Sequence, residues 1–126
     1  MKRQRIPILV YHHVYEDEAP VLPQRNGESG AGIISESQFL RQMRYLADEG
    51  WRVVSTARIV AWLNASGGLP ERAVVLHFDN GWLDTFTVSF PTLQRLGMAA
   101  TCLPITDGVE AATHGEGVSV RNRTGL

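Results

Sequence analysis

The sequence predicts an α/β fold in which a parallel sheet alternates with helices. Short, β-branched apolar segments recur along the chain, and segments whose apolar residues lie three or four positions apart separate them. Glycine, proline and helix-capping residues stand at the junctions between the two kinds of segment. Strands that alternate with helices pair in parallel through right-handed crossovers, which gives the predicted fold class.

Composition limits what this chain of 126 residues could do. It is 44% hydrophobic and 20% charged, enough for one ordinary core, and its formal net charge of -1 predicts no nucleic-acid partner. The only cysteine, Cys102, lies in an apolar run and is expected to be buried. The apolar run after the basic start is too short for a signal peptide, and no stretch could span a bilayer. We therefore expect a cytoplasmic protein without a transmembrane segment.

The first strand is predicted at residues 6–11, a nearly continuous apolar run typical of a central strand that is buried on both faces. Residues 12–34 are polar and glycine-rich without a hydrophobic period, which predicts a long loop. His12 and His13 follow the strand directly. Adjacent strand residues face opposite ways, so only one of these two histidines is expected to enter a site.

The first helix is predicted to begin after Ser35, where Gln38 completes a capping box. Apolar residues then recur on one face, and Gly50 is a natural end. A short strand at residues 52–55 and a second helix from Ser55 or Thr56 follow, and glycines and a proline between positions 67 and 70 end that helix.

The third strand is predicted at residues 73–78 and runs directly into the turn sequence Asp79-Asn80-Gly81. Apolar residues at helical spacing come next, and Pro91 divides them into two helical pieces, because a proline inside a helix removes a hydrogen bond. Gly97 ends the second piece, and residues 98–103 form the fourth predicted strand. The polar residues 107–126 are expected to be a poorly ordered tail after a domain of residues 1–106.

Polar residues that follow the predicted strands are the candidates for chemistry, because sites in parallel sheets gather beyond the carboxyl ends of the strands. Asp79 is a candidate general base, with a capping or turn aspartate as the structural alternative. His77, two residues earlier on the same face, fits better as a buried, hydrogen-bonded structural histidine. The ligand spacings His-x-x-x-His and His-Glu-x-x-His are both absent from the sequence.

Three further residues have both a structural and a functional interpretation. Trp82 could be a platform on which a sugar stacks, or an aromatic side chain that packs beside the turn. Asp84 begins a predicted helix, where its favourable interaction with the helix dipole is a sufficient explanation. His114 stands alone in the glycine-rich tail and is expected to be a solvated loop residue.

The stretch VVLHFDNGWLDTFTVSFPTLQRLGMAATCLPIT, residues 74–106, resembles the first motif region of the polysaccharide deacetylase family. There a strand ends in Thr-Phe-Asp-Asp-Gly, and an aromatic residue, an aspartate, a Pro-x-Leu helix, a glycine and an Ala-Thr strand follow. ILVYHHV, residues 8–14, resembles the Tyr-His strand of the subgroup that includes biofilm poly-N-acetylglucosamine deacetylases, and residues 37–55 resemble that subgroup's connecting helix and strand.

This resemblance implies a distorted β/α barrel that uses a divalent metal such as zinc to hydrolyse N-acetyl or similar amides on a carbohydrate. Asp79 matches the family's general base, which activates a metal-bound water, and Asn80 matches a metal ligand. His12 is a further candidate metal ligand, and Trp82 is the candidate for substrate binding.

The sequence departs from the family pattern at the metal site. Asn80 replaces a charged ligand and brings no anionic charge to zinc, and His77 replaces the usual threonine. The family's downstream histidine pair, arginine and acid motifs have no match. A closed barrel of this kind needs about 200 residues or more. We therefore expect an incomplete deacetylase domain that is inactive alone and self-associates through an open sheet edge.

Two alternatives stay open at this point. The chain could be a catalytically inactive binding or interaction module, for example one that pairs its sheet edge with another chain. It could also be a family relative that hydrolyses non-sugar amides, because nothing in the sequence identifies the substrate.

Overall fold

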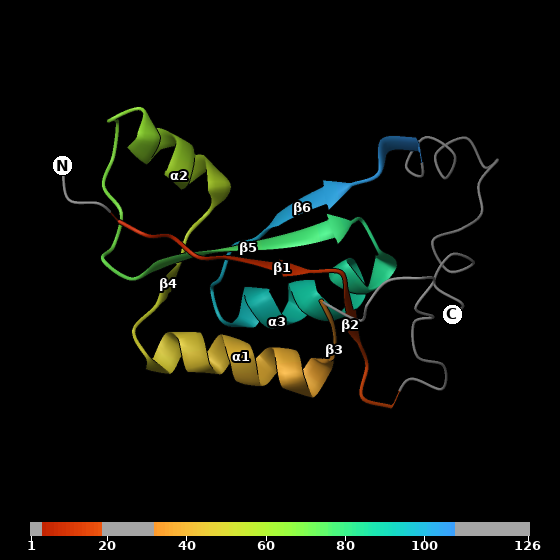
Figure 1. The fold of residues 1–126 in the computed structure, drawn as a ribbon. Coiled ribbons are helices and arrows are strands. Elements are labelled where there is room, and N and C mark those ends of the chain that lie inside the picture. The colour runs from red at the N-terminus through yellow and green to blue at the C-terminus, as the bar shows by residue number, and fades with distance from the viewer. Residues whose placement is uncertain (1–3, 19–31, 108–126) are drawn as a thin grey trace.

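A computed structural model describes residues 4–18 and 32–107, and a four-stranded parallel sheet lies at its centre (Figure 1). The central strand, β5 (Ala73–Asn80), pairs in parallel with β1 (Ile8–Tyr11), β4 (Arg52–Val53) and β6 (Thr101–Pro104). A separate two-stranded parallel sheet joins β2 (His13–Tyr15) to β3 (Ile33–Ser35). The predicted α/β fold with a parallel sheet is confirmed.

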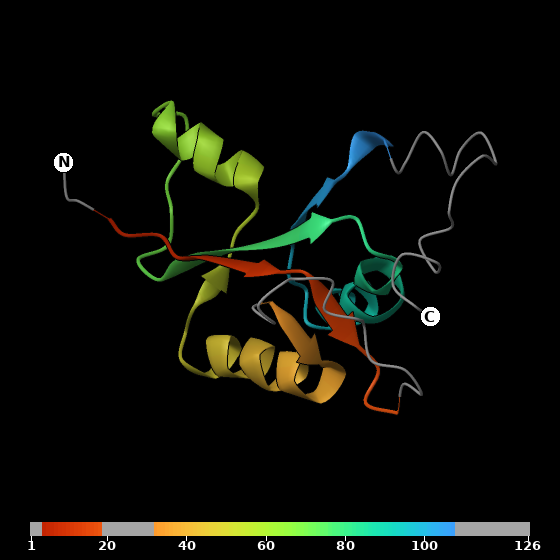
Figure 2. The ribbon, with the colours of Figure 1, turned by 45° about the vertical axis from the view of Figure 1, so that its right-hand side comes forward.

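Helices cover both faces of the central sheet. They are α1 (Glu36–Asp48), α2 (Thr56–Leu63), the single π-helical turn η1 (Thr85–Ser89) and α3 (Phe90–Arg95). In Figures 1 and 2, α1 and α3 lie on one side of β5, while α2 lies on the other side near β4. None of the described helices combines the length and the apolar character needed to cross a membrane.

The start of α1 follows from local chemistry, as predicted. The Ser35 hydroxyl accepts a hydrogen bond from the Gln38 amide, and the Gln38 side chain accepts one from the Ser35 amide, which completes the capping box. Gly50 follows the helix with a φ of 73°, a backbone conformation that glycine adopts without strain. The capped helix can therefore present a continuous apolar face to the sheet.

A cluster of three aromatic rings joins α1 to the sheet. Tyr11 of β1 lies 5.1 Å from Phe39 and 5.4 Å from Phe78 between ring centroids, and Phe39 lies 5.9 Å from Phe78. The Tyr11 hydroxyl donates to Gln42 Oε1 at 2.7 Å, and burial raises the pKa of Tyr11 to about 12. A smaller cluster on the opposite face packs Val75 and its neighbours against Ile59 of α2.

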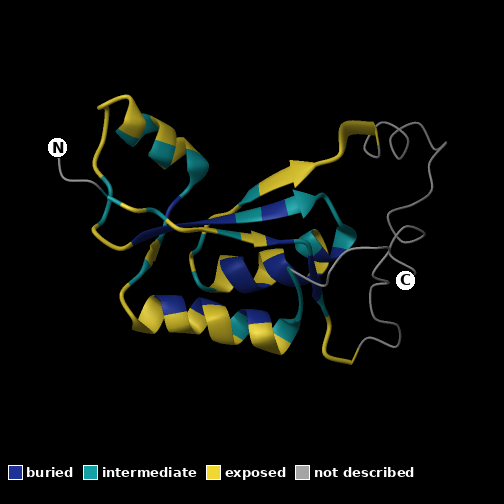
Figure 3. Ribbon diagram, viewed as in Figure 1, coloured by how far each residue is buried: buried dark blue, intermediate teal, exposed yellow. Residues whose placement is uncertain are grey.

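The edges of the sheet are more exposed than the sequence suggested. Ile8 and Val10 are 55% and 44% exposed, so the prediction that the first strand is central and buried on both faces is wrong. Cys102 in β6 is also exposed instead of buried. Figure 3 shows the contrast between β6 and the buried middle of β5. In β1 the two exposed residues alternate with Leu9 and Tyr11, which face the core, so only one face of this strand is covered.

The region predicted as one long loop contains the short strands β2 and β3. Residues 19–31 between them lie outside the described residues, as does the predicted tail beyond Asp107, including His114. The amide groups of His12 and His13 both donate to the Gly32 carbonyl, at 2.8 and 3.1 Å, which joins the two ends of this region. Three-residue strands leave no hydrophobic period for a sequence-based prediction to detect.

The helical region after Gly81 divides into two pieces, as predicted. Pro91 is the second residue of α3, and Gly97 ends this helix with a φ of 64°. Phe86 and Phe90, which the periodicity assigned to the apolar face, are 69% and 50% exposed and stack on each other instead. Only some of the apolar residues that recur at helical spacing after Gly81 are therefore part of the core.

Replacing Phe39 should destabilise the fold strongly. Phe39 has an exposure of 0%, and Phe39→Ala should lower the free energy of unfolding by about 3–5 kcal/mol through lost burial and a cavity. Tyr45→Ala, on the same helix but 61% exposed, should change it by less than about 0.5 kcal/mol. Urea unfolding measures both values, and similar losses would contradict the assignment of Phe39 to the core.

Gly81 should tolerate alanine less well than Gly50, although their φ values are 72° and 73°. An added Cβ at Gly81 would lie 2.9 Å from the Pro104 Cβ, whereas one at Gly50 would meet nothing within 4 Å. Gly50→Ala should therefore lose only the roughly 1–2 kcal/mol of left-handed backbone strain, and Gly81→Ala should lose more. Equal losses in chemical unfolding would show that the approach of β6 to this turn is unimportant.

Candidate active site

The parallel register of β1 and β5 brings the first two candidate residues together. Tyr11 lies opposite Phe78, so the next residues, His12 and Asp79, lie beside each other at the carboxyl ends of β1 and β5. His12 Nε2 lies 3.9 Å from Asp79 Oδ2, and their side chains are 28% and 34% exposed. An imidazole and a carboxylate therefore face each other at an edge that solvent reaches.

Asn80 completes a group of three neighbouring side chains. Its Nδ2 lies 3.5 Å from His12 Nδ1, and its backbone has a φ of 74°, a left-handed conformation that asparagine tolerates better than most residues. The structure thus assembles Asp79, Asn80 and His12, the three residues predicted at this edge. β5 continues through Asp79 and Asn80, so the turn starts at Gly81, later than predicted.

His13 faces away from this group, as adjacent strand residues should. Its Nδ1 donates a hydrogen bond of 2.7 Å to Asp84 Oδ2, and both side chains are 5% exposed. Asp84 precedes η1 but makes no capping hydrogen bond, so the helix-dipole interpretation missed its actual partner. No local signal could have found this pair, because 71 positions separate the two residues.

Trp82 packs beside the turn, which was the structural alternative for this residue. Its ring stacks on the His13 imidazole with centroids 4.4 Å apart and an angle of 29° between planes. One indole face is therefore occupied inside the protein, and its Nε1 is buried. A sugar could stack only on the other face, and substrate binding by Trp82 stays a prediction.

His77 lies one layer below Asp79 and is hydrogen-bonded, as expected, though only partly buried. The Thr56 hydroxyl lies 3.2 Å from His77 Nε2 and 2.7 Å from the Thr101 hydroxyl. These three side chains connect α2, β5 and β6 in one polar network. His77 thus has a structural role that uses its ring nitrogen.

The described residues do not complete a zinc site. Within residues 4–18 and 32–107, no group of three or more His, Cys, Asp or Glu side chains could jointly hold a metal ion. Asp79 and His12 are two suitable donors, and the third neighbour, Asn80, presents its amide nitrogen towards His12. Protein zinc sites ordinarily need at least three good ligands, so this donor set does not fit a resident zinc ion.

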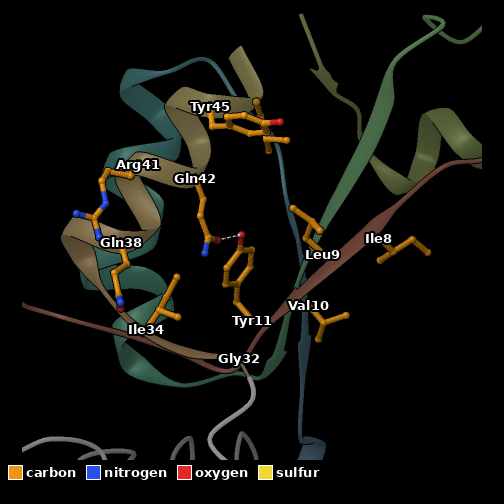
Figure 4. Close-up of a pocket in the computed structure, with 11 residues that line it drawn as sticks. Ile8, Leu9, Val10, Tyr11, Gly32, Ile34, Gln38, Arg41, Gln42 and Tyr45 are labelled. Carbon is orange, nitrogen blue, oxygen red and sulfur yellow. Dashed lines mark hydrogen bonds between the residues drawn. The ribbon is translucent and has the colours of Figure 1, made fainter. Parts of the chain in front are cut away.

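A groove between β1 and α1 lies apart from these residues (Figure 4). Leu9, Tyr11 and Ile34 form part of its lining, and the Tyr11–Gln42 hydrogen bond crosses it. Neither Asp79 nor His12 lines this groove. The candidate chemistry therefore belongs to the open carboxyl-end edge of the sheet and not to the groove.

Sequence comparison finds relatives among deacetylases, although no model of a protein family matches the chain. Over 103 residues the chain is 34% identical to the poly-β-1,6-N-acetyl-D-glucosamine N-deacetylase of Escherichia coli K12. This match covers 82% of this chain and 14% of that protein. The chain is also 24% identical over 113 residues to YxkH of Bacillus subtilis, which carries a polysaccharide deacetylase name. That match covers 90% of this chain and 36% of YxkH, so the chain spans about a third or less of these relatives.

Solved structures agree with the sequence matches. The de-N-acetylase from Aggregatibacter actinomycetemcomitans superposes with a TM-score of 0.72 and 30% identity, over 83% of this chain and 39% of that one. IcaB from Ammonifex degensii superposes with a TM-score of 0.62 and 26% identity, over 80% of this chain and 38% of the IcaB chain. Sequence and fold together show that this chain belongs to the polysaccharide deacetylase family and matches a part of the length of its relatives.

Proposed function

We propose that the chain carries the acid–base residues of an enzyme that hydrolyses N-acetyl amides on a carbohydrate. The observation that carries this proposal is the pairing of Asp79 with His12 across the ends of β5 and β1. A carboxylate and an imidazole 3.9 Å apart at an accessible edge can divide the two proton transfers of amide hydrolysis between them. The family relationship supports this interpretation over a chance ion pair.

The proposed chemistry follows from the two side chains. Asp79 takes a proton from a water molecule while the water oxygen attacks the acetyl carbon. The carbon–nitrogen bond then breaks, acetate forms, and protonated His12 supplies the proton that the leaving amine needs. We assign no step to a metal ion, because the described donors do not complete a zinc site. A divalent metal such as zinc stays part of the proposal through the family relationship alone.

The carbohydrate substrate is proposed from the relatives. The E. coli relative is named for poly-β-1,6-N-acetyl-D-glucosamine, and we propose an N-acetylated glucosamine polymer for this chain too. The chain spans only 14% of that protein. We therefore expect these 126 residues to turn over substrate slowly by themselves.

A binding or interaction module is the second candidate function, and exposed sheet edges favour it. Ile8, Val10 and Leu103 are apolar side chains on β1 and β6 that are 44–55% exposed. Strands with an unpaired edge can add a further strand from another chain. Self-association through these strands is part of this candidate.

The test of function measures acetate released from a soluble N-acetylglucosamine oligomer by the wild type and by Asp79→Asn. Release that Asp79→Asn abolishes would support a working site in this chain. Oligomer binding without release would support the binding module. A folded protein that neither binds the oligomer nor releases acetate would overturn the carbohydrate substrate.

Asn80→Asp should raise the affinity for Zn²⁺ roughly tenfold or more, because a carboxylate adds the anionic charge that an amide lacks. Titration calorimetry measures the change. Asn64→Asp is the matched control, because it adds the same charge at an exposed position that ends α2. If both variants gain equally, net charge would explain the effect, and Asn80 would have no ligand position.

A further inference from the structure

The contacts between the residues after β1 and those at and beyond the end of β5 include two imidazole–carboxylate pairs, which differ in strength. The His12–Asp79 pair spans 3.9 Å between partly exposed side chains. The His13–Asp84 hydrogen bond spans 2.7 Å between side chains that are 5% exposed. Exposed ion pairs are weak and screened by solvent, whereas buried, charge-assisted hydrogen bonds are short and directional. The buried pair is therefore the contact that can fix the distance between the two segments.

The backbone transmits this constraint to the candidate active site. His13 follows His12 directly, and both amide groups are held by the Gly32 carbonyl. On the other segment, Asn80 and Gly81 have φ values of 74° and 72°, and Gly81 lies against Pro104 of β6. Little freedom remains between Asp79 and Asp84, so a shift of either buried partner would move the reactive pair.

Buried polar groups are concentrated in residues 82–89, the segment that carries Asp84. Besides the His13 bond and the stacked Trp82 ring, four buried polar atoms have no hydrogen-bond partner among the described residues. They are Trp82 Nε1, Asp84 Oδ1, Thr85 Oγ1 and Ser89 Oγ. Burying such groups is unfavourable, and unsatisfied polar groups in native proteins are often found where function fixes the residue type. Stability alone would be better served by apolar side chains here.

We propose that His13 and Asp84 are positioning residues, whose buried hydrogen bond, stacked beneath Trp82, sets the approach of His12 to Asp79. This inference rests on the proposed function only in giving His12 and Asp79 a catalytic role. Neither His13 nor Asp84 reaches the substrate in this arrangement. Their task is to hold the acid–base pair at a distance that its own weak, exposed contact cannot maintain.

The test is imidazole NMR of the full chain with ¹⁵N-labelled histidines, in which His→Gln variants assign each ring. In the wild type, neutral His13 should carry its proton on Nδ1, and this proton should exchange slowly with water. Asp84→Ala should accelerate that exchange roughly tenfold or more and shift the His12 ring signals. The His77 signals should stay in place, because its ring nitrogen is held by the Thr56 hydroxyl and not by His13 or Asp84.

Two further variants distinguish a positioning role of Asp84 from a general loss of stability of the fold. Asp84→Asn keeps an amide oxygen that accepts from His13 but removes the carboxylate charge. It should therefore shift the His12 signals in the same direction as Asp84→Ala and by a smaller amount, and it carries the test if Asp84→Ala does not fold. Leu46→Ala removes buried side-chain volume near the distant end of α1 and should leave the His12 signals unchanged. The proposal is overturned if the His12 signals do not respond to Asp84→Ala or Asp84→Asn. It also fails if His77 or the Leu46→Ala control responds as much as His12 does.

The spectra need no substrate, so this inference and the proposed function can fail independently. If His12 responds but no variant or wild-type protein releases acetate or binds the oligomer, the positioning pair stands and the carbohydrate function does not. If acetate release depends on Asp79 but not on Asp84, and His12 does not respond, the function stands and the positioning role does not.

Discussion

The parallel pairing of β1 with β5 is the constraint on which the candidate site depends. The register that sets Tyr11 opposite Phe78 packs both rings against Phe39, and it also brings His12 to Asp79. A slip of one residue would turn Tyr11 to the opposite face of the sheet and separate the acid–base pair. The core and the site are thus consequences of one register, and the aromatic cluster stabilises both.

The site divides reactivity and support between neighbouring residues. A general base has to exchange protons with water, and the partial exposure of Asp79 and His12 allows this. An exposed pair stabilises its own geometry by only about 0–1 kcal/mol, so precise placement must come from elsewhere. His13 and Asp84 are adjacent to these residues in the chain or fold but excluded from solvent, which suits a supporting contact. Alternation of side-chain direction along β1 and β2 produces this division.

Local signals predicted the elements well, and contacts between distant segments account for most errors. Ser35 and Gln38 identify the start of α1, because the residues of a capping box lie within four consecutive positions. The strand-end rule also brought Asp79, Asn80 and His12 to one edge. The exposure of Val10 and Cys102 depends instead on which elements pack against β1 and β6, and residue type does not encode this. The His13–Asp84 contact joins positions too far apart for any local pattern.

Asn80 and His77 differ from the family pattern without displacing the candidate base. Asparagine is suited to the left-handed backbone at position 80, so local geometry gives an explanation for its presence that is independent of metal. His77 reaches the Thr56 hydroxyl and occupies the layer beneath Asp79. One departure removes a charge and the other replaces a hydroxyl with an imidazole, yet the Asp79 carboxylate still faces His12. The position of Asp79 therefore depends on the register of β1 and β5 and on the buried His13–Asp84 hydrogen bond. Affinity for a metal depends instead on the charge of the side chains at the carboxyl-end edge of the sheet.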